Sequence, residues 1–415
     1  MSEAAEHFDV AIVGGGPAGA AAAITLARSG AQVALCDKAY FPREKCCGDG
    51  LTTGALRRLE QLGVAVPGLA GFTRVDTLHV RSPSGRVAKV PLSSGGRRAA
   101  PGLRAGVVRR LDLDAALVAS ARKAGVRVLE GHGLEAIAPA EGGVAIEAGG
   151  RLLRAAHVVA ADGAWSTVRK VLEPSSAPRH QSPADWHAYR AYAHGVSASA
   201  ASELWVWFPS ELLPGYAWSF PLAGGRANVG ICLARGSGES GGELAERWRR
   251  FADSPLLASL LGNGATFEPV RSWPIPSALS LERLCALDGR VLFVGDAAGA
   301  ADPFSGEGVA QALETGIAAA HAISDGRASH DAAARYRSAI AASLALEQRM
   351  ARACRRVMAR PLGARGAVRL TGANAWTLRY VGRWLYEDFP RTLVVAPHTW
   401  RRGVLSQPPP FSSVR

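Results

Sequence analysis

The chain has 415 residues, 48% of them hydrophobic, so it can bury a large core in two or three domain-sized units, which excludes extensive disorder. No apolar run reaches the roughly 18 residues that a membrane-spanning helix needs, so we expect a protein that does not cross a membrane. The six cysteines are scattered without CxxC spacing, and the polar N-terminus does not resemble a secretory leader, so we expect a reducing, cytoplasmic location.

The net charge is +13, and most of it lies near the C-terminus. Residues 331–415 contain 15 arginines and four acidic residues, so they carry +11 of the total. Such a segment attracts an anionic lipid surface at the inner face of the membrane or a diphosphate-bearing substrate, or it forms a solvated helical surface; these alternatives stay open. No helix-turn-helix, zinc finger or aromatic RNA platform is recognisable, so we expect no nucleic-acid partner.

The N-terminal residues predict a nucleotide-binding unit. The apolar run at residues 9–13 predicts a buried strand, residues 17–28 predict an Ala-rich helix that Gly30 ends, and residues 32–36 predict a second strand. The segment Gly-Gly-Gly-Pro-Ala-Gly at residues 14–19 connects the first strand to the helix. This strand, turn and helix context is typical of a dinucleotide-binding fold.

Each glycine of the turn has a separate purpose in such a fold. Gly14 permits the tight turn, Gly16 lets the backbone approach a pyrophosphate, and Gly19 allows close packing of the helix. Asp37, which follows Gly14 by 23 residues, is placed to accept hydrogen bonds from both hydroxyls of the adenosine ribose. This unit alone does not distinguish NAD from FAD.

The remaining patterns are of two kinds. The parallel style of the first unit continues in a helix at residues 113–123, strands at 126–129, 157–161 and 291–294, and a helix at 309–324. Between residues 184 and 233 the pattern alternates and is rich in aromatic residues, for example at 204–208 and 216–220, which predicts antiparallel strands facing a pocket. Beyond residue 332 the chain is predicted to be helical, with breaks at Pro361 and Gly363.

Two later motifs resemble those of flavoprotein hydroxylases. Asp162 lies in Ala-Asp-Gly-Ala-Trp-Ser, directly after a predicted strand and upstream of Arg169, and resembles their DG motif. Asp296 lies in Gly-Asp-Ala-Ala after the strand at 291–294 and resembles their GD motif, whose aspartate hydrogen-bonds the ribityl chain of FAD. Together with the glycine-rich turn, these motifs imply that FAD is the cofactor and that Asp162 and Asp296 bind it.

The same resemblance implies further contacts with FAD. Residues 302–309 resemble a loop that leads into a helix beneath the flavin ring, so the amides near Gly308 and Val309 would stabilise negative charge at N1 and O2 of the reduced flavin. Arg110 matches the single arginine that approaches the cofactor, with Arg109 as the alternative. Gly133 matches a backbone position near the adenine.

The segment Phe-Pro-Arg-Glu-Lys-Cys-Cys-Gly-Asp-Gly-Leu at residues 41–51 resembles the geranylgeranyl reductase family, in which a proline precedes Cys-Gly-x-Gly. The resemblance implies that Cys47, Gly48 and Gly50 lie beside the flavin. Cys46 departs from the pattern, because many members have proline there. Cys47 is either a catalytic thiol or a small apolar residue packed near the cofactor.

A second element of that family, Y-x-W-x-F-P-x8-G-x-G, is matched by residues 216–221 and by Gly230. Tyr216 and Trp218 would share one face of a strand and present apolar surface and one hydroxyl to isoprene units. Cys232 replaces the final glycine, which alters this wall of the pocket. Aromatic residues at this spacing are also typical of an ordinary core.

Two other features have more than one interpretation. The segment Trp-Val-Trp-Phe-Pro at residues 205–209 resembles an element of flavin halogenases with a spacing one residue short, and we predict a strand of the pocket there. Arg190 either meets a polar group of the substrate or forms a salt bridge. The histidines lack metal-ligand spacing, so we expect no metal.

These patterns predict an α/β fold with a Rossmann-like domain. We expect a discontinuous FAD-binding domain in residues 1–75, 100–175 and 275–330, and an antiparallel-sheet substrate domain in 76–99 and 176–274 inserted into it. A basic C-terminal helical region in 331–415 would cap the pocket.

The family resemblance implies an FAD-dependent oxidoreductase that reduces C=C bonds of an apolar prenyl substrate by hydride transfer from reduced FAD. Cys47, or a water held by Tyr216, would supply the proton, and Trp218 would line the pocket. NAD(P)H or a small reduced electron carrier would reduce the flavin. The alternatives are a monooxygenase or halogenase-like enzyme acting on an apolar or aromatic metabolite, and a non-enzymatic flavin-binding scaffold.

Overall fold

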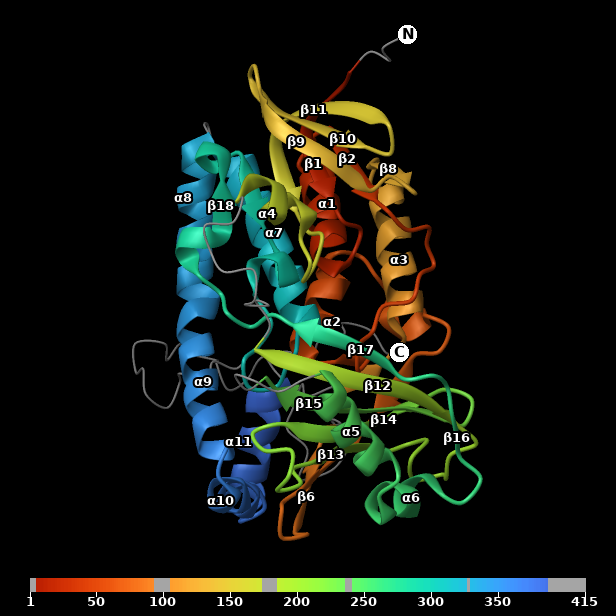
Figure 1. Ribbon diagram of the computed structural model, residues 1–415. Helices are drawn as coiled ribbons and strands as arrows, with labels where there is room; N and C mark the ends of the chain where they lie inside the picture. The colour runs from red at the N-terminus through yellow and green to blue at the C-terminus, as the bar shows by residue number, and fades with distance from the viewer. Residues whose placement is uncertain (1–4, 93–104, 174–184, 236–240, 327–328, 387–415) are drawn as a thin grey trace.

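The computed structural model describes residues 5–92, 105–173, 185–235, 241–326 and 329–386. Two sheets, each of eight strands, divide these residues into two lobes, with the first sheet at the top of Figure 1 and the second below it. A third, three-stranded sheet consists of β3 (Gly50–Leu51), β7 (Ala105–Val107) and β4 (Thr73–Val75). The predicted α/β architecture is confirmed.

The first sheet is largely parallel. Its strand order is β18 (Cys285–Ala286), β19 (Val291–Phe293), β11 (Arg151–Ala160), β1 (Glu6–Val13), β2 (Val33–Asp37) and β8 (Arg127–Glu130), and the hairpin of β9 (Leu134–Ala140) and β10 (Gly143–Ala148) pairs with β11. Val13 pairs with Cys36 on one side and with Ala160 on the other. The turns that follow these three strands therefore emerge at one edge of the sheet, where ligands of open parallel sheets bind.

Helix α1 (Pro17–Arg28) packs against α7 (Val309–Asp325) on one side and α3 (Arg110–Lys123) on the other, as Figure 1 shows. The α1–α7 contact is very close, because a Cβ atom on Gly316 would lie 2.2 Å from the carbonyl oxygen of Ala18. The Ala-rich sequence of α1 permits this approach, since short side chains let helix axes come together. The shorter helices α2 (Thr53–Gln61) and α4 (Thr167–Leu172) complete this lobe.

The second sheet is antiparallel except where β13 pairs with β5. Its order is β16 (Thr266–Phe267), β12 (Trp186–His194), β15 (Arg226–Ala234), β14 (Tyr216–Leu222), β13 (Leu204–Trp207), β5 (Thr77–Arg81) and β6 (Val87–Pro91), and β17 (Arg271–Ile275) pairs with β12. Helices α5 (Gly241–Ala252) and α6 (Pro255–Leu261) pack on its outer face through a separate apolar cluster. Its inner face is left for a pocket.

The C-terminal helices run beside both lobes. Helices α8 (Ser329–Ile340) and α9 (Leu346–Met358) are continuous through a π-helical segment, Ala341–Ala345, and α10 (Pro361–Thr371) and α11 (Ala375–Tyr386) follow. Pro361 starts α10 as predicted, but the predicted break at Gly363 is wrong. Gly363 lies within α10, where a Cβ atom would meet the carbonyl oxygen of Val357 at 2.0 Å, so the corner between α9 and α10 needs it.

Predicted and observed elements differ mainly at their ends. The helix predicted at 17–28 is α1, but α3 begins three residues before the predicted residue 113, and β11 begins at Arg151 rather than at 157. Helices α5 and α6 were not predicted. The part of the predicted C-terminal helical region beyond residue 386 lies outside the described residues, and the domain limits stay a prediction. Among the described helices none is both long and apolar enough to cross a bilayer.

Replacing Gly316 with alanine should destabilise the protein. Its Cβ would collide with the backbone of α1, so we expect a loss of about 1–3 kcal/mol in the free energy of unfolding, measured by chemical denaturation. Gly366 of α10 is the matched control, because a Cβ there meets nothing within 4 Å. Gly366→Ala should be neutral or stabilising by up to about 1 kcal/mol, and equal losses in both variants would contradict the packing argument.

Candidate functional site

One large pocket, with a volume of about 940 Å³, lies between the two lobes. It starts at the edge where β1, β2 and β11 end and continues along the inner face of the second sheet to the C-terminal helices. The predicted site residues other than Gly19 all line it: Gly14, Gly16, Asp37, Cys47, Gly48, Gly50, Arg110, Gly133, Asp162, Tyr216, Trp218, Asp296, Gly308 and Val309. The fold thus brings the separate motifs together, although the function of each residue stays a prediction.

The three glycines of the first turn have different surroundings. A Cβ atom on Gly14 would lie 2.3 Å from the Ala161 carbonyl oxygen, and one on Gly19 would lie 1.9 Å from the Gly14 carbonyl oxygen. Packing within the protein explains both. A Cβ on Gly16 would meet no atom closer than Arg43 Nη2, at 3.6 Å, so only a ligand that approaches the backbone explains this glycine.

Two helices direct their N-termini at the pocket. Gly16 is the N-cap of α1 and Gly308 is the N-cap of α7, and neither helix has a side-chain cap. An uncapped N-terminus offers free N–H donors and partial positive charge. The pocket therefore has two separate places that attract negative charge, as the pyrophosphate and the reduced flavin ring of FAD require.

The acidic residues of the motifs are held by backbone amides. Asp37 accepts hydrogen bonds from the N–H groups of Gly15, at 2.7 Å, and Ala39, at 2.8 Å. Asp162 Oδ2 accepts one from the Val168 N–H at 3.0 Å, whereas Asp162 Oδ1 is buried without a protein partner. Asp162 as a residue lines the pocket, so we expect a ligand hydroxyl or N–H to satisfy this acceptor.

Arg169 connects the DG and GD motifs. Its Nη2 donates to the carbonyl oxygen of Ala297 at 2.9 Å, and its guanidinium lies 3.8 Å from the ring centroid of Phe293. The two motifs are therefore fixed relative to each other across the end of the first sheet. With Gly16, the two helix N-termini and Asp162, they form a site whose residues fit FAD.

Arg110 rather than Arg109 lines the pocket. The Arg110 guanidinium donates to both oxygens of Asp114, at 2.7 and 2.8 Å. Burial opposes its charge, but the carboxylate outweighs burial and raises the pKa of Arg110 above its ordinary value. Arg109 instead pairs with Glu44 and lies over the Tyr192 ring, so the geometry favours Arg110 as the arginine that approaches the cofactor.

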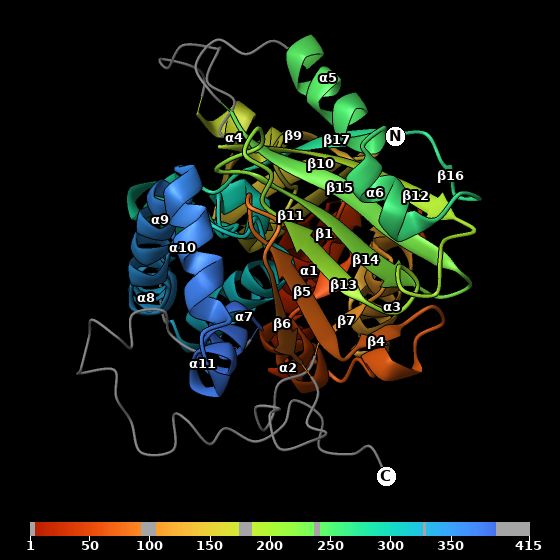
Figure 2. The same cartoon turned by 90° about the horizontal axis from the view of Figure 1, so that it is seen from below.

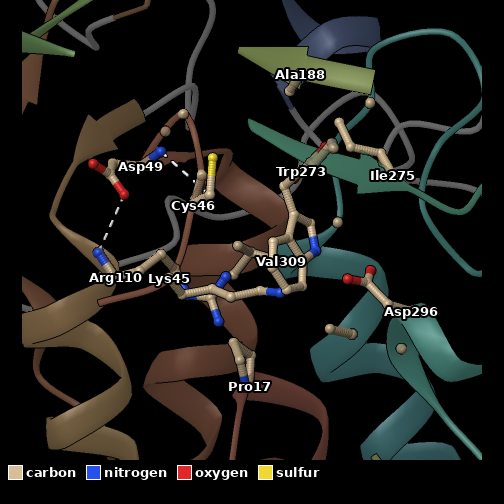
Figure 3. A pocket seen from close by; sticks show the side chains of 18 of the residues that line it. Pro17, Lys45, Cys46, Asp49, Arg110, Ala188, Trp273, Ile275, Asp296 and Val309 are labelled. Atoms are coloured by element: carbon tan, nitrogen blue, oxygen red, sulfur yellow. Dashed lines mark hydrogen bonds between the residues drawn. The ribbon is translucent and has the colours of Figure 1, made fainter. Parts of the chain in front are cut away.

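Residues 46–50, here called the cysteine loop, cross the pocket between the two lobes. The Asp49 N–H donates to Cys47 Sγ at 3.3 Å, and Asp49 Oδ1 accepts from the Arg110 N–H at 3.2 Å (Figure 3). Burial raises the pKa of Cys47 and raises that of Cys46 to about 11, so both thiols keep their protons at neutral pH. The Asp49 amide and the Arg110 charge would stabilise the thiolate if Cys47 gave up its proton.

Asn228 is a site residue that the sequence patterns did not reveal. Its Nδ2 donates to Asp49 Oδ2 and to the Cys47 carbonyl oxygen, both at 2.8 Å, and its Oδ1 accepts from Trp218 Nε1 at 3.0 Å. The side chain is fully buried, and Asp49 also accepts a hydrogen bond from Tyr192. Asn228 falls in the unspecified gap of the Y-x-W-x-F-P-x8-G-x-G element, and only its alternation with Gly230 could have indicated that the two residues share one face of β15.

Three aromatic side chains of β14 form one wall of the pocket, as predicted for two of them. The ring centroids of Tyr216 and Trp218 are 6.0 Å apart, and those of Trp218 and Phe220 are 6.1 Å apart. A Cβ on Gly230 would lie 2.1 Å from Trp218 Cζ2, so the glycine of the family element makes room for this indole. The Tyr216 hydroxyl donates to the carbonyl oxygen of Ser305, which fixes the ring.

Cys232, where the family element has glycine, is 1% exposed and lies with Tyr216 and Trp218 in one buried apolar cluster. Cys232 also lines the pocket, so its thiol occupies volume that a glycine would leave empty. The effect of this replacement on the shape of the pocket wall stays a prediction.

The other predicted pocket strand, β13, turns its tryptophans away. Val206 lines the pocket, whereas Trp207 packs against Phe251 of α5 on the outer face of the sheet. The resemblance to the halogenase element is therefore not reflected in the pocket. Arg190 both lines the pocket and lies 3.5 Å from Glu44, so the salt-bridge interpretation of this arginine is the one observed.

The C-terminal helices close the pocket on the side opposite the first sheet. The lining includes Met358 of α9, Val368 of α10, and Trp384 and Leu385 of α11. These side chains are apolar, as is the aromatic wall that they face. The expectation that this region caps the pocket is confirmed for residues up to 386.

Lys45 belongs to the motif at residues 41–51, but the motif predicts no function for it. Its Nζ lies 3.5 Å from the ring centroid of Trp273, and Figure 3 shows the two side chains together between Arg110 and Asp296. Burial lowers the pKa of Lys45 to about 8, with Arg110 and Arg43 contributing and Asp296 opposing the shift. A buried ammonium beside two helix N-termini strengthens the attraction for an anionic cofactor.

Comparisons with known proteins agree with this site. A family model described as an FAD binding domain matches residues 7–344. The menaquinone reductase of Mycolicibacterium smegmatis is 31% identical over 350 residues, which cover 77% of this chain and 76% of that protein. Digeranylgeranylglycerophospholipid reductase 2 of Methanopyrus kandleri is 29% identical over 339 residues, covering 80% of each.

Among solved structures, a geranylgeranyl bacteriochlorophyll reductase-like protein from Thermoplasma acidophilum has a TM-score of 0.77 and 22% identity, covering 95% of this chain and 100% of that one. Solved monooxygenases and halogenases also have this fold. The structural likeness therefore supports the fold, and the sequence matches support the family.

Replacing Gly16 with alanine should weaken FAD binding without destabilising the apoprotein. The backbone at Gly16 is extended, and the added methyl group has space in the polypeptide but occupies the place into which a phosphate fits. We expect at least a tenfold loss of FAD affinity by titration calorimetry, with an unchanged melting temperature of the apoprotein. Unchanged affinity would contradict the assignment of Gly16 to the phosphate site.

FAD affinity should fall as the pH rises through about 8. Lys45 loses its positive charge in this range, and bound negative charge favours the protonated amine, so binding takes up a proton, and affinity falls by up to about tenfold per pH unit. Lys45→Met, which keeps the apolar stem, should bind FAD more weakly at pH 7 and flatten this profile. Lys89→Met, on β6 away from the pocket, is the control, and an unchanged profile in Lys45→Met would refute the idea.

Proposed function

This chain belongs to the geranylgeranyl reductase family of FAD-dependent oxidoreductases, and from that premise we propose that it reduces C=C bonds in the prenyl chain of a lipid substrate. The family membership and the FAD-dependent redox chemistry are established by the sequence matches. The substrate class is our proposal. Relatives named for a quinone and for geranylgeranyl lipids motivate it.

The apolar arm of the pocket is the observation that carries this proposal. From the cysteine loop it runs between the wall of Tyr216, Trp218 and Phe220 and the apolar side chains of α10 and α11. A flexible linear chain of methyl-branched isoprene units fits such an apolar space better than a compact polar metabolite does, because its burial is driven by apolar area.

The residues near the cysteine loop can donate the proton that the reduction of a C=C bond requires. Reduction of C=C adds a hydride to one carbon and a proton to the other, and reduced FAD, when bound, supplies the hydride. Cys47 keeps its proton at rest because burial raises the pKa of its thiol. The Asp49 amide and Arg110 would hold the resulting thiolate, so we assign Cys47 as the proton donor. Tyr216 holds the wall in place through its bond to Ser305.

The electrons come, in this proposal, from NAD(P)H or from a small reduced carrier that reduces FAD before each turnover.

The alternative is a monooxygenase acting on an apolar metabolite, since solved monooxygenases have the same fold. The two functions differ in their products. A reductase adds two hydrogen atoms to the substrate without oxygen, whereas a monooxygenase consumes oxygen and adds one oxygen atom.

The test is anaerobic incubation of the reduced enzyme with a prenylated quinone and with geranylgeranyl compounds, followed by mass spectrometry. We expect a gain of two hydrogen atoms. No such gain with any prenyl substrate, together with substrate-dependent oxygen consumption and a hydroxylated product in air, would replace the proposal with the alternative.

Cys47→Ala should lower the rate of saturated product formation by at least about 100-fold, because general acid catalysis contributes on that scale. The rate at which the electron donor bleaches the flavin absorbance should stay within a few-fold of the wild type. Cys285→Ala, whose thiol lies outside the pocket, is the matched control. Full activity of Cys47→Ala would remove the thiol as the proton donor.

A further inference from the structure

Helices α9, α10 and α11 lie in a strongly basic stretch of the chain. Between Glu347 and Glu387 the sequence contains nine arginines and no acidic residue or lysine. The pocket needs few of these charges, because the residues that the three helices contribute to its lining are mostly apolar. Arg383 is buried, and Arg352 and Arg355 contact Gln348 and Asp185. The exposed arginines therefore require an explanation on the outside of the molecule: Arg349, Arg356, Arg360, Arg365 and Arg369.

The outer side of the same helices also exposes large apolar side chains. Val357, Leu362, Leu370 and Trp376 are 57%, 78%, 67% and 68% exposed. Ten large hydrophobic side chains are exposed among the described residues, and these four fall within 20 consecutive positions, so they are concentrated rather than scattered. Concentrated exposed apolar surface marks an interaction site.

The apolar and basic side chains share one side of α10. Leu362, Arg365 and Arg369 are exposed, whereas Ala364 and Val368 are buried. This spacing of three, four and seven residues separates an outer face from an inner face of one helix. We call the outer face, with Arg356, Arg360, Val357, Leu370 and Trp376 beside it, the basic–apolar face.

The inner face of these helices lines the pocket through Met358, Val368 and Thr371. Figure 1 shows α9, α10 and α11 together at one end of the molecule, and Figure 2 shows α10 beside α9. A single layer of helices therefore separates the basic–apolar face from the apolar arm of the pocket. A partner on this face would be adjacent to the place where an apolar substrate is held.

We propose that the basic–apolar face docks on the surface of an anionic phospholipid bilayer. Arginines attract the negative headgroups, and exposed Leu and Trp side chains insert at the boundary between headgroups and acyl chains. No described helix can span a bilayer, so the contact is interfacial. Delivery of the substrate from the leaflet to the pocket rests on the proposed function, whereas docking itself does not.

The test is flotation of the full-length holoprotein with vesicles of phosphatidylcholine alone and of an equimolar mixture with phosphatidylglycerol. We expect at least tenfold tighter binding to the anionic vesicles, weakened by added salt. Absence of flotation with anionic vesicles, or equal binding to both kinds, would overturn the proposal.

Two sets of variants localise the contact. The first is a triple variant of the apolar residues, with Leu362→Ser, Leu370→Ser and Trp376→Ser. The second is a double variant of the arginines, with Arg365→Gln and Arg369→Gln. Each variant should reduce binding to anionic vesicles at least tenfold. The matched controls are Phe267→Ser with Val270→Ser, and Arg249→Gln with Arg250→Gln, which alter exposed residues on and beside the second sheet. Equal effects in test and control variants would overturn the assignment of this face.

Flavin absorbance and melting temperature show whether each variant is folded. If the apolar triple variant loses its flavin, the vesicle binding of the arginine double variant alone tests the assignment of this face. A change of molecular mass in light scattering without lipid, reversed by the apolar variant, would instead identify this face as an interface between two copies of the chain and would overturn the proposal.

Turnover separates this proposal from the proposed function. If docking is correct, the variants should reduce detergent-dispersed prenyl substrate at the wild-type rate but vesicle-embedded substrate more slowly. If no prenyl substrate is reduced by the wild type, the proposed function fails while the flotation result still stands.

Discussion

The close contact between α1 and α7 is the constraint on which the site depends. Both helices begin beside the pocket with glycine N-caps that leave their first N–H groups available, and their N-termini converge because Gly316 lets the α7 backbone reach Ala18. Partial charges at helix ends act within about one turn. A small separation of the helices would therefore remove one of the two anion-attracting ends from the pocket, even if every side chain stayed in place.

A second level of organisation joins the two lobes. Asn228, on the second sheet, binds the cysteine loop through Asp49 and Cys47 and binds the aromatic wall through Trp218. The cysteine loop is in turn held by Arg110 at the start of α3. Because these groups are hydrogen-bonded to one another, the relative position of Cys47, the proposed proton donor, and the aromatic wall is fixed before any ligand binds.

The C-terminal helices combine two surfaces that usually belong to separate parts of a protein. Their inner side completes an apolar pocket, and their outer side carries arginines together with exposed Leu and Trp residues. An apolar substrate that resides in lipid faces a large cost on crossing water. The membrane contact that we propose would lie one helix away from the pocket and would shorten that path.

The sequence alone determined the fold class and the first strand, helix and strand unit, and it indicated most of the residues that line the pocket, because these depend on local features. Gly14, Gly16 and Asp37 are fixed by their spacing around a strand and a helix, and Tyr216 and Trp218 by alternation within one strand. The tertiary structure decided everything that depends on contacts between distant segments. Asp114 pairs with Arg110 and Glu44 pairs with Arg109, and with these partners Arg110 is the arginine that lines the pocket. Trp207, of the halogenase-like segment, packs outward against Phe251 of α5. Asn228 belongs to the site because it hydrogen-bonds Asp49 and Cys47, which lie far away in the sequence. Lys45 belongs to it because burial lowers the pKa of its amine. Such pairings are absent from any local pattern, since the free energy of a buried polar group is set by neighbours that only the folded chain supplies.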